Sequence, residues 1–162
     1  MTALAFRNVD ASPDDPVAEW PVEGIQTALE RGGLTYWRRL AEAIRAQPWG
    51  QVARRVEEVL TYSRPYGVAD VMERVVGEAR RAAETNERQA VAAEVRRLVD
   101  ESGLTRADFA SRIGTSASRL STYVNGKVTP SASLLLRMRG LAAEAEGALE
   151  PRHAPPRDLI TI

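Results

Sequence analysis

The side chains of this chain that can take part in chemistry are mainly carboxylates, guanidinium groups and hydroxyls, because cysteine is absent and histidine occurs once. Adjacent carboxylates occur at Asp14-Asp15, Glu57-Glu58 and Asp100-Glu101. Neighbouring residues on a helix point about 100° apart, so each pair is poorly placed to work as a catalytic acid and base. The sequence therefore predicts that the protein is not an enzyme.

Metal and nucleotide sites are not indicated either. A zinc site needs about three or four ligands, and His153 lies alone in a proline-rich segment. The Gly126-Lys127 pair lacks the upstream glycine and the following serine or threonine of a phosphate-binding loop. We therefore expect no metal and no cofactor.

Basic residues gather in one part of a chain whose formal net charge is zero. Residues 92–140 hold eight basic and four acidic residues, a balance of +4, whereas residues 1–91 and 141–162 each carry −2. A cationic segment within a neutral protein is the charge pattern of a nucleic-acid-binding region. Hydroxyls and cations in this segment would then contact phosphates and base edges.

Apolar residues that recur every three or four positions predict three helices in the N-terminal half. They begin near Val22, near Thr35, which we expect to cap the second helix, and near Gln51. The residues expected to face inward are Ile25, Ala28, Leu29, Trp37, Leu40, Ala41, Ile44, Val52, Val56, Val59 and Leu60. Trp20, Trp37 and Trp49 are expected to anchor the core of this region.

A long proline-free stretch follows, rich in Ala, Glu and Arg. Because these residues are good helix formers, residues 68–102 predict one long helix or two nearly collinear ones. Large apolar residues are scarce between Ala82 and Arg88, which indicates a domain boundary there. No apolar run approaches the ~18 residues that span a bilayer, and the first ten residues do not form a signal peptide, so we expect a cytoplasmic protein.

Residues 95–139 predict four short helices joined by tight turns. Gly103 and Gly114 supply turns, and Thr105 and Ser116 supply N-caps, with Asp108 completing a capping-box pattern. Asn125-Gly126 ends the third helix and Pro130-Ser131 begins the fourth. The residues expected to form a small core are Val95, Leu98, Val99, Phe109, Ala110, Ile113, Leu120, Tyr123 or Val124, Leu134, Leu135 and Met138.

This order of residues resembles the Cro and phage-repressor (XRE-type) helix-turn-helix family. The matching residues are Gly103-Leu104-Thr105, Phe109-Ala110, Ile113-Gly114, Ser116, Leu120, Asn125-Gly126-Lys127 and Pro130-Ser131. The resemblance covers less than a third of the chain. Together with the helices predicted for residues 22–102, it indicates an all-α protein, in which an N-terminal helical domain is joined by a long helix to a C-terminal lambda-repressor-like helix-turn-helix domain.

Four segments are predicted on this basis. Residues 1–21 form an extended lead-in, residues 22–85 a helical oligomerisation or partner-binding domain, residues 86–149 the XRE-type DNA-binding domain, and residues 150–162 a flexible tail.

The resemblance also implies that the helix beginning at Ser116 enters the major groove of DNA. The base-facing residues would be Ala117, Ser118, Ser121 and Thr122. The phosphate-contacting residues would be Thr105, Arg106, Ser116, Arg119, Asn125, Gly126 and Lys127, with the turn at 125–127 offering backbone N–H groups and an ammonium group.

This sequence departs from the family at several of these positions. Family members often carry Gln or Arg where this chain has Ala117, Ser118 and Thr122, and usually Gln where it has Arg106. Short side chains cannot form bidentate base contacts, so specificity is expected to rest on Arg119, bridging waters or DNA shape. The remaining arginines of the segment, Arg96, Arg97, Arg137 and Arg139, are expected on a solvated face.

The function implied is that of a sequence-specific transcriptional regulator, whose partners are double-stranded DNA and a second copy of the chain. Three interpretations stay open. The first is an autorepressing antitoxin of a toxin-antitoxin system whose N-terminal domain binds a cognate toxin, since the layout is similar to small actinobacterial-style regulators. The second is a plain prophage or host repressor, and the third is a protein-binding adaptor with a degenerate helix-turn-helix.

Overall fold

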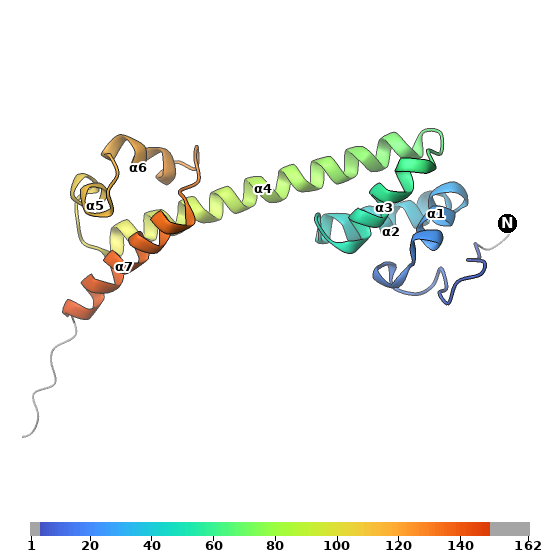
Figure 1. The fold of residues 1–162 in the computed structure, drawn as a ribbon, viewed down its shortest axis with the longest axis horizontal. Coiled ribbons are helices and arrows are strands. Elements are labelled where there is room, and N and C mark those ends of the chain that lie inside the picture. Colours follow the sequence, from blue (N-terminus) through green and yellow to red (C-terminus); the bar gives the residue numbers. More distant parts are fainter. Residues whose placement is uncertain (1–3, 150–162) are drawn as a thin grey trace, which may run out of the picture. The chain divides into compact units, whose positions relative to one another are not determined.

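The computed structural model describes residues 4–149 (Figure 1). These residues form seven α-helices and one short 3-10 helix, with no strand among them. The predicted all-α fold class is therefore confirmed. The chain divides between Thr85 and Asn86 into two compact units. The predicted flexible tail at residues 150–162, with His153, lies outside the described residues.

In the N-terminal unit, α1 (Val22–Arg31) packs against α2 (Gly33–Ala46) and α3 (Gln51–Tyr62). Apolar residues recur every three or four positions in these helices, so one face of each is buried. The first turns of α4 (Val68–Glu101) complete the core. Its buried side chains include Ile25, Ala28, Leu29, Leu40, Ala41, Ile44, Val52, Val56, Val59, Leu60, Val68, Met72 and Val76. The aliphatic residues predicted to face inward are therefore buried as expected.

The segment before α1 also belongs to this core. It contains the 3-10 helix η1 (Val17–Glu19) and the fully buried Trp20, whose indole N–H donates to the carbonyl of Asp15 at 3.0 Å. Arg39 of α2 lies 4.8 Å from the Trp20 ring centroid and donates to the same carbonyl at 2.7 Å. The segment predicted as an extended lead-in therefore packs against the core of this unit, through Trp20, Val17 and the partly buried Phe6.

Two expectations for this unit are wrong. Thr35 lies inside α2 and does not cap it, because Gly33 takes a φ of 69° and turns the chain sharply enough for the next helix to begin at once. Trp49 is 46% exposed, since it lies in the turn between α2 and α3 and not on a helix face. Trp37, in contrast, packs against the core and donates to the carbonyl of Ala28 at 2.9 Å.

A single 34-residue helix, α4, has its two ends in different units. Val68, Met72 and Val76 belong to the N-terminal core, whereas Val95 and Leu98 belong to the C-terminal core. Residues 84–90 between them are all exposed. The alternative of two collinear helices is therefore excluded in favour of one helix.

The C-terminal unit combines the end of α4 with α5 (Arg106–Ile113), α6 (Ala117–Val124) and α7 (Ala132–Leu149). α5 packs against both α6 and α7. The buried residues are Val95, Leu98, Val99, Phe109, Ala110, Ile113, Leu120, Tyr123, Val124, Met138 and Ala142, with Leu134 and Leu135 partly buried against them. The core predicted for residues 95–139 is confirmed, and both Tyr123 and Val124 contribute to it.

None of the helices between residues 4 and 149 combines the length and the apolar character needed to cross a bilayer.

Candidate nucleic-acid interface

The beginning of α5 is held by Thr105, as predicted. Its hydroxyl accepts a hydrogen bond from the backbone N–H of Asp108 at 3.2 Å and donates one to the Asp108 carboxylate at 2.6 Å. In a capping box, the side chain of Glu or Gln is long enough to accept from the backbone N–H of the cap residue. The shorter Asp108 side chain accepts from the hydroxyl of Thr105 instead. The Thr105 hydroxyl is therefore used within the chain, and the exposed guanidinium of Arg106 stands next to it at the first position of α5.

A tight turn connects α5 to α6. Gly114 takes a φ of 80°, and the N–H of Thr115 donates to the carbonyl of Ala110 at 2.9 Å, which closes the end of α5. The Ser116 hydroxyl then accepts from the N–H of Arg119 at 3.1 Å and begins α6. Because Gly114 and Ser116 both act locally, only three residues separate the end of α5 from the start of α6.

The outer face of α6 carries small side chains. Ala117 and Ser118 are exposed, and Ser121 and Thr122 are half-buried, whereas Leu120 lies on the opposite, buried face. The four residues predicted to face DNA bases therefore share the side of α6 that points away from the core.

Two of the hydroxyls on this face are already hydrogen-bonded. Thr122 donates to the carbonyl of Arg119 at 2.7 Å, and Ser121 accepts from the side-chain amide of Asn125 at 3.3 Å. A hydroxyl that donates to its own helix still has acceptor capacity but no second proton to donate. Thr122 can therefore offer a partner outside the chain only its methyl group and its hydroxyl oxygen as an acceptor.

Arg119 is positioned by a buried tyrosine. Its Nε donates to the hydroxyl of Tyr123 at 3.0 Å, and Tyr123 is itself packed in the core. This bond uses only Nε, so the two terminal amino groups can bind an anion in the planar fork that guanidinium offers. The arrangement fixes a cation at the edge of the outer face of α6.

The turn after α6 differs from the prediction. The N–H groups of Asn125, Gly126 and Lys127 donate to the carbonyls of Ser121, Tyr123 and Thr122, at 3.1, 3.1 and 3.0 Å. These bonds satisfy the carbonyls at the helix end. The expectation that the three N–H groups bind a phosphate is therefore wrong. The exposed side chain of Lys127 and the side chain of Asn125 remain as candidate donors.

The four arginines expected on a solvated face make bonds within the domain. Arg96 donates to the carbonyl of Val124 at 2.6 Å, and Arg137 donates to that of Ile113 at 3.4 Å, so each meets the negative end of a helix. Arg97 pairs with Glu94 and Glu101 at 2.9 and 2.5 Å. Arg139 lies 3.2 Å from Glu94.

Only some of these arginine contacts could be predicted from the sequence. The three- and four-residue spacings of Glu94, Arg97 and Glu101 are those of helix ion pairs, whereas Arg96 reaches a residue 28 positions away. Hydrogen bonds from Arg97 and then Arg139 lower the pKa of Glu94 below its ordinary value, although partial burial opposes them. Glu94 and Glu101 are thus paired on α4, while Arg106, Arg119 and Lys127 are exposed along α5, α6 and the following turn.

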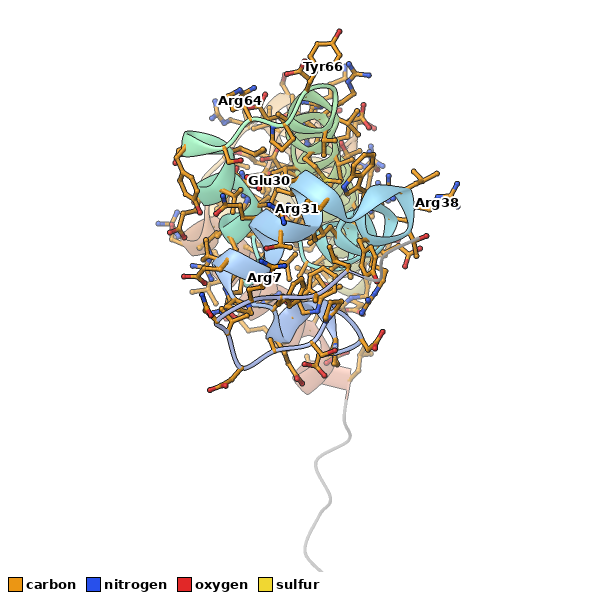
Figure 2. All side chains as sticks on the ribbon, turned by 90° about the vertical axis from the view of Figure 1, so that its right-hand side faces the viewer. Arg7, Glu30, Arg31, Arg38, Arg64 and Tyr66 are labelled. Atoms are coloured by element: carbon orange, nitrogen blue, oxygen red, sulfur yellow. The ribbon has the colours of Figure 1, made fainter. Side chains whose placement is uncertain are left out.

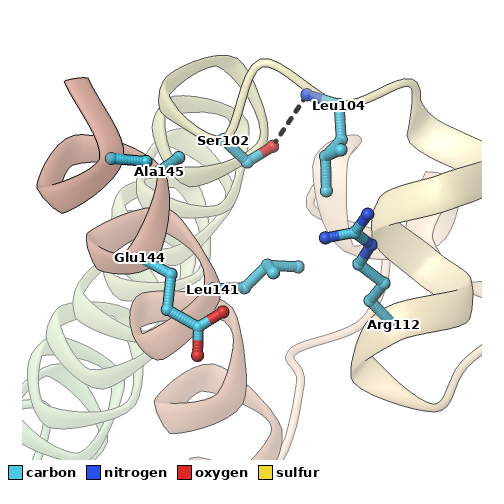
Figure 3. Close-up of a pocket in the computed structure, with 7 residues that line it drawn as sticks. Ser102, Leu104, Arg112, Leu141, Glu144 and Ala145 are labelled. Atoms are coloured by element: carbon cyan, nitrogen blue, oxygen red, sulfur yellow. Dashed lines mark hydrogen bonds between the residues drawn. The ribbon is translucent and has the colours of Figure 1, made fainter.

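A small pocket of about 210 Å³ lies between the end of α4, α5 and α7 (Figure 3). Leu104 and Leu141 line it together with the side chains of Arg112 and Glu144. The Ser102 hydroxyl accepts from the N–H of Leu104 at 3.2 Å at its edge. Among residues 4–149, no group of three or more His, Asp or Glu side chains could hold a metal ion.

The spacing of α5, the Gly114 turn and α6 over the end of α4 can be compared with known domains. Residues 90–144 match the family model of a helix-turn-helix domain. The helix-turn-helix domain of this chain therefore includes the last turns of α4, all of α5 and α6, and most of α7. No curated protein and no solved structure matches the chain. The match identifies this domain and leaves residues 1–89 and 145–162 outside it.

Proposed function

We propose that the protein is a sequence-specific DNA-binding transcriptional regulator that inserts α6 into the major groove. The observation that carries this proposal is the form of α6 itself. The helix is held at its start by Ser116 and at its end by Arg96, it buries Leu120 on one side, and it presents small side chains on the other, with Arg119 at the edge. A short helix that is fixed at both ends and buried on one side can enter the major groove with its other side, and small side chains there let its backbone come close to the base edges.

Base contacts are assigned to Ala117, Ser118, Ser121 and Thr122. Short side chains offer one hydrogen bond or a methyl contact each, and the methyl groups of Ala117 and Thr122 suit the thymine methyl. Because no bidentate contact is available from these four residues, Arg119, bridging waters and DNA shape would supply much of the sequence preference.

Phosphate contacts are assigned to three places in the motif: the start of α5, the start of α6 and the turn after α6. Arg106 lies at the positive end of the α5 dipole, where an anion is favoured, and Thr105 is its neighbour. Ser116 and Arg119 lie at the corresponding end of α6. At the other end of α6, Lys127 supplies the charge beside Asn125 and Gly126. Contacts of this kind set the position of the domain on DNA and give binding its salt dependence.

Two copies are expected to bind together. A helix-turn-helix of this size contacts few base pairs, and a two-fold pair of domains matches two half-sites about one DNA turn apart. The operator would then be a near-palindrome.

The N-terminal unit supports a finer proposal, in which the regulator is an autorepressing antitoxin that binds a toxin through this unit. The unit has its own core, and it exposes Trp49, Tyr62 and Tyr66, of which Tyr66 projects fully into solvent at the turn before α4 (Figure 2). Exposed aromatic residues are enriched at protein interfaces. In a plain repressor, this unit would serve only in dimerisation.

Co-expression with the product of the neighbouring gene tests this finer proposal. A stable complex that is lost when Tyr62 and Tyr66 are both changed to Ser supports an antitoxin. DNA binding by the chain without any such complex supports a plain prophage or host repressor.

One observation favours the adaptor as a second candidate. The hydroxyls of Ser121 and Thr122 are already bonded within the chain, which reduces what α6 can read in DNA. An adaptor would bind DNA only at low salt and without sequence preference.

Selection of duplexes from a random pool tests the main proposal. We expect the wild-type protein to enrich one motif with two half-sites, and Ser118→Gln to change bases within each half-site. Ala93→Gln, an exposed change on α4, should leave the motif unchanged. Failure to enrich any motif would overturn sequence-specific recognition.

A further inference from the structure

The outer face of α7 has no partner within the described residues of the chain. Leu136 on this face is 64% exposed, although it lies within a helix of a packed domain. Gly140, Ala143 and Gly147 are exposed at the following helical positions of the same face. The opposite face buries Met138 and Ala142 against the domain core.

Neither the packing nor the backbone conformation of the domain requires the two glycines on this face. A Cβ atom added at Gly140 or Gly147 would meet nothing within 4 Å, and neither glycine has a positive φ. Glycine within a helix is unfavourable relative to alanine. The two exposed glycines therefore destabilise α7, and no contact within the domain compensates for this. A second helix lying close against α7 would use the space that these residues leave.

The charges beside this face are arranged in a self-complementary pattern. On a helix wheel, Arg137 and Glu144 lie on one flank of the face, and Arg139 and Glu146 lie on the other. On both flanks the arginine precedes the glutamate by seven residues. The face is therefore positive towards the start of α7 and negative towards its end. Its charges are complementary to those of the same face on a second helix that runs in the opposite direction.

We propose that α7 pairs in antiparallel orientation with α7 of a second copy of this chain. In the register that satisfies both flanks, Leu136 lies against Gly147 of the second copy, and Gly140 lies against Ala143. Arg137 then faces Glu144 of the second copy, and Arg139 faces Glu146. Every contact occurs twice, as in a two-fold interface.

The arginines are able to make these contacts in addition to their present ones. Arg139 contacts Glu94 through Nε at 3.2 Å, and its side chain is 54% exposed. Arg137 contacts the carbonyl of Ile113 through one terminal nitrogen at 3.4 Å. Since a guanidinium group has five N–H donors, most donors of both residues remain for the second copy.

This inference deepens the proposed function, which needs two copies on one operator, but the pairing itself needs no DNA. Sedimentation equilibrium of the full chain therefore tests it separately from recognition. We expect a reversible dimer for the wild-type protein. A monomer throughout the micromolar range would overturn the proposal, whether or not the protein binds DNA.

The interface is located with substitutions that the isolated domain accommodates. Gly140→Leu and Gly147→Leu place side chains in open space and improve helix propensity, but they fill the gap that the second helix needs. Each should raise the dimer dissociation constant by about tenfold or more. Ala82→Leu adds the same side chain at an exposed position of α4 and should leave the constant unchanged. Equal constants for all variants would place the interface elsewhere.

Charge exchange provides a test that does not depend on packing. The double variant Arg137→Glu/Arg139→Glu makes both flanks negative, and Glu144→Arg/Glu146→Arg makes both flanks positive. We expect each variant alone to be monomeric and an equimolar mixture to form a heterodimer. Arg81→Glu/Arg88→Glu, the same charge change on α4, should remain a homodimer. A mixture that stays monomeric, or double variants that dimerise alone, would overturn the antiparallel register.

Discussion

Arg96 on α4 donates a hydrogen bond of 2.6 Å to the backbone carbonyl of Val124, the last residue of α6. The carbonyls at a helix end lack partners within the helix, and a cation there also meets the negative end of the helix dipole. One arginine that never needs to touch DNA thus holds the end of the helix that we propose enters the major groove.

Removal of this side chain should loosen α6. Arg96→Ala leaves the Val124 carbonyl to water, and the loss of a charged hydrogen bond costs about 1 kcal/mol or slightly more. Hydrogen exchange measured by mass spectrometry should show faster exchange across residues 117–124 by about fivefold, since 1 kcal/mol is close to that factor.

Arg97→Ala is the matched control for this change. Arg97 is the next residue of α4, but its partners Glu94 and Glu101 are on the same helix, and such surface pairs are worth about 0.5 kcal/mol or less. Equal exchange rates in α6 for the two variants would show that Arg96 does not support α6.

Thr122 should read DNA through its methyl group. Its hydroxyl proton is directed to the carbonyl of Arg119, so Thr122→Val keeps the methyl contact, whereas Thr122→Ser removes it. On the selected operator we expect Thr122→Ser and Thr122→Ala to weaken binding by roughly 1 kcal/mol and Thr122→Val to bind nearly as well as wild type. Equal losses on operator and random DNA would count against a base contact.

Lys127 and Arg106 should contribute charge without sequence preference. Each cation that contacts a phosphate releases about one counterion, so Lys127→Ala and Arg106→Ala should each reduce the salt slope of the binding constant by about one. The measurement is a titration of DNA at several salt concentrations, with Arg97→Ala as the control. A slope that does not change would remove the residue from the phosphate contacts.

Gly114 should be intolerant of a side chain for conformational reasons alone. A Cβ atom at this position would lie 3.6 Å from the nearest heavy atom, an ordinary contact, but the φ of 80° is costly for any other residue. Gly114→Ala should therefore lower the free energy of unfolding of the domain by about 1–2 kcal/mol. Thermal denaturation checks this, and an unchanged midpoint would show that the turn adapts.

The parts of the domain that follow local rules were predictable from the sequence. Thr105 and Ser116 cap the helices that they precede, and Gly114 makes the turn, because each acts on backbone groups within a few residues of itself. The buried positions of α5 and α6 follow from helical spacing for the same reason.

Contacts between distant residues were not predictable in this way. The bond from Arg96 to Val124 depends on the packing of α4 against α6, and nothing in the sequence near Arg96 marks its partner. The N–H groups of residues 125–127 were expected to face DNA, but the way in which α6 ends directs them inwards. Trp49 looked like a core residue by type, and its position in a turn leaves it half-exposed.

The most direct test of the account is fluorescence anisotropy with DNA from upstream of the gene, compared with a scrambled duplex at about 50 and 200 mM salt. If α6 reads base sequence, the upstream DNA should bind more tightly than the scrambled duplex, and this binding should survive the higher salt. Equal binding to both duplexes, lost at the higher salt, would contradict the assignment of the protein as a sequence-specific regulator.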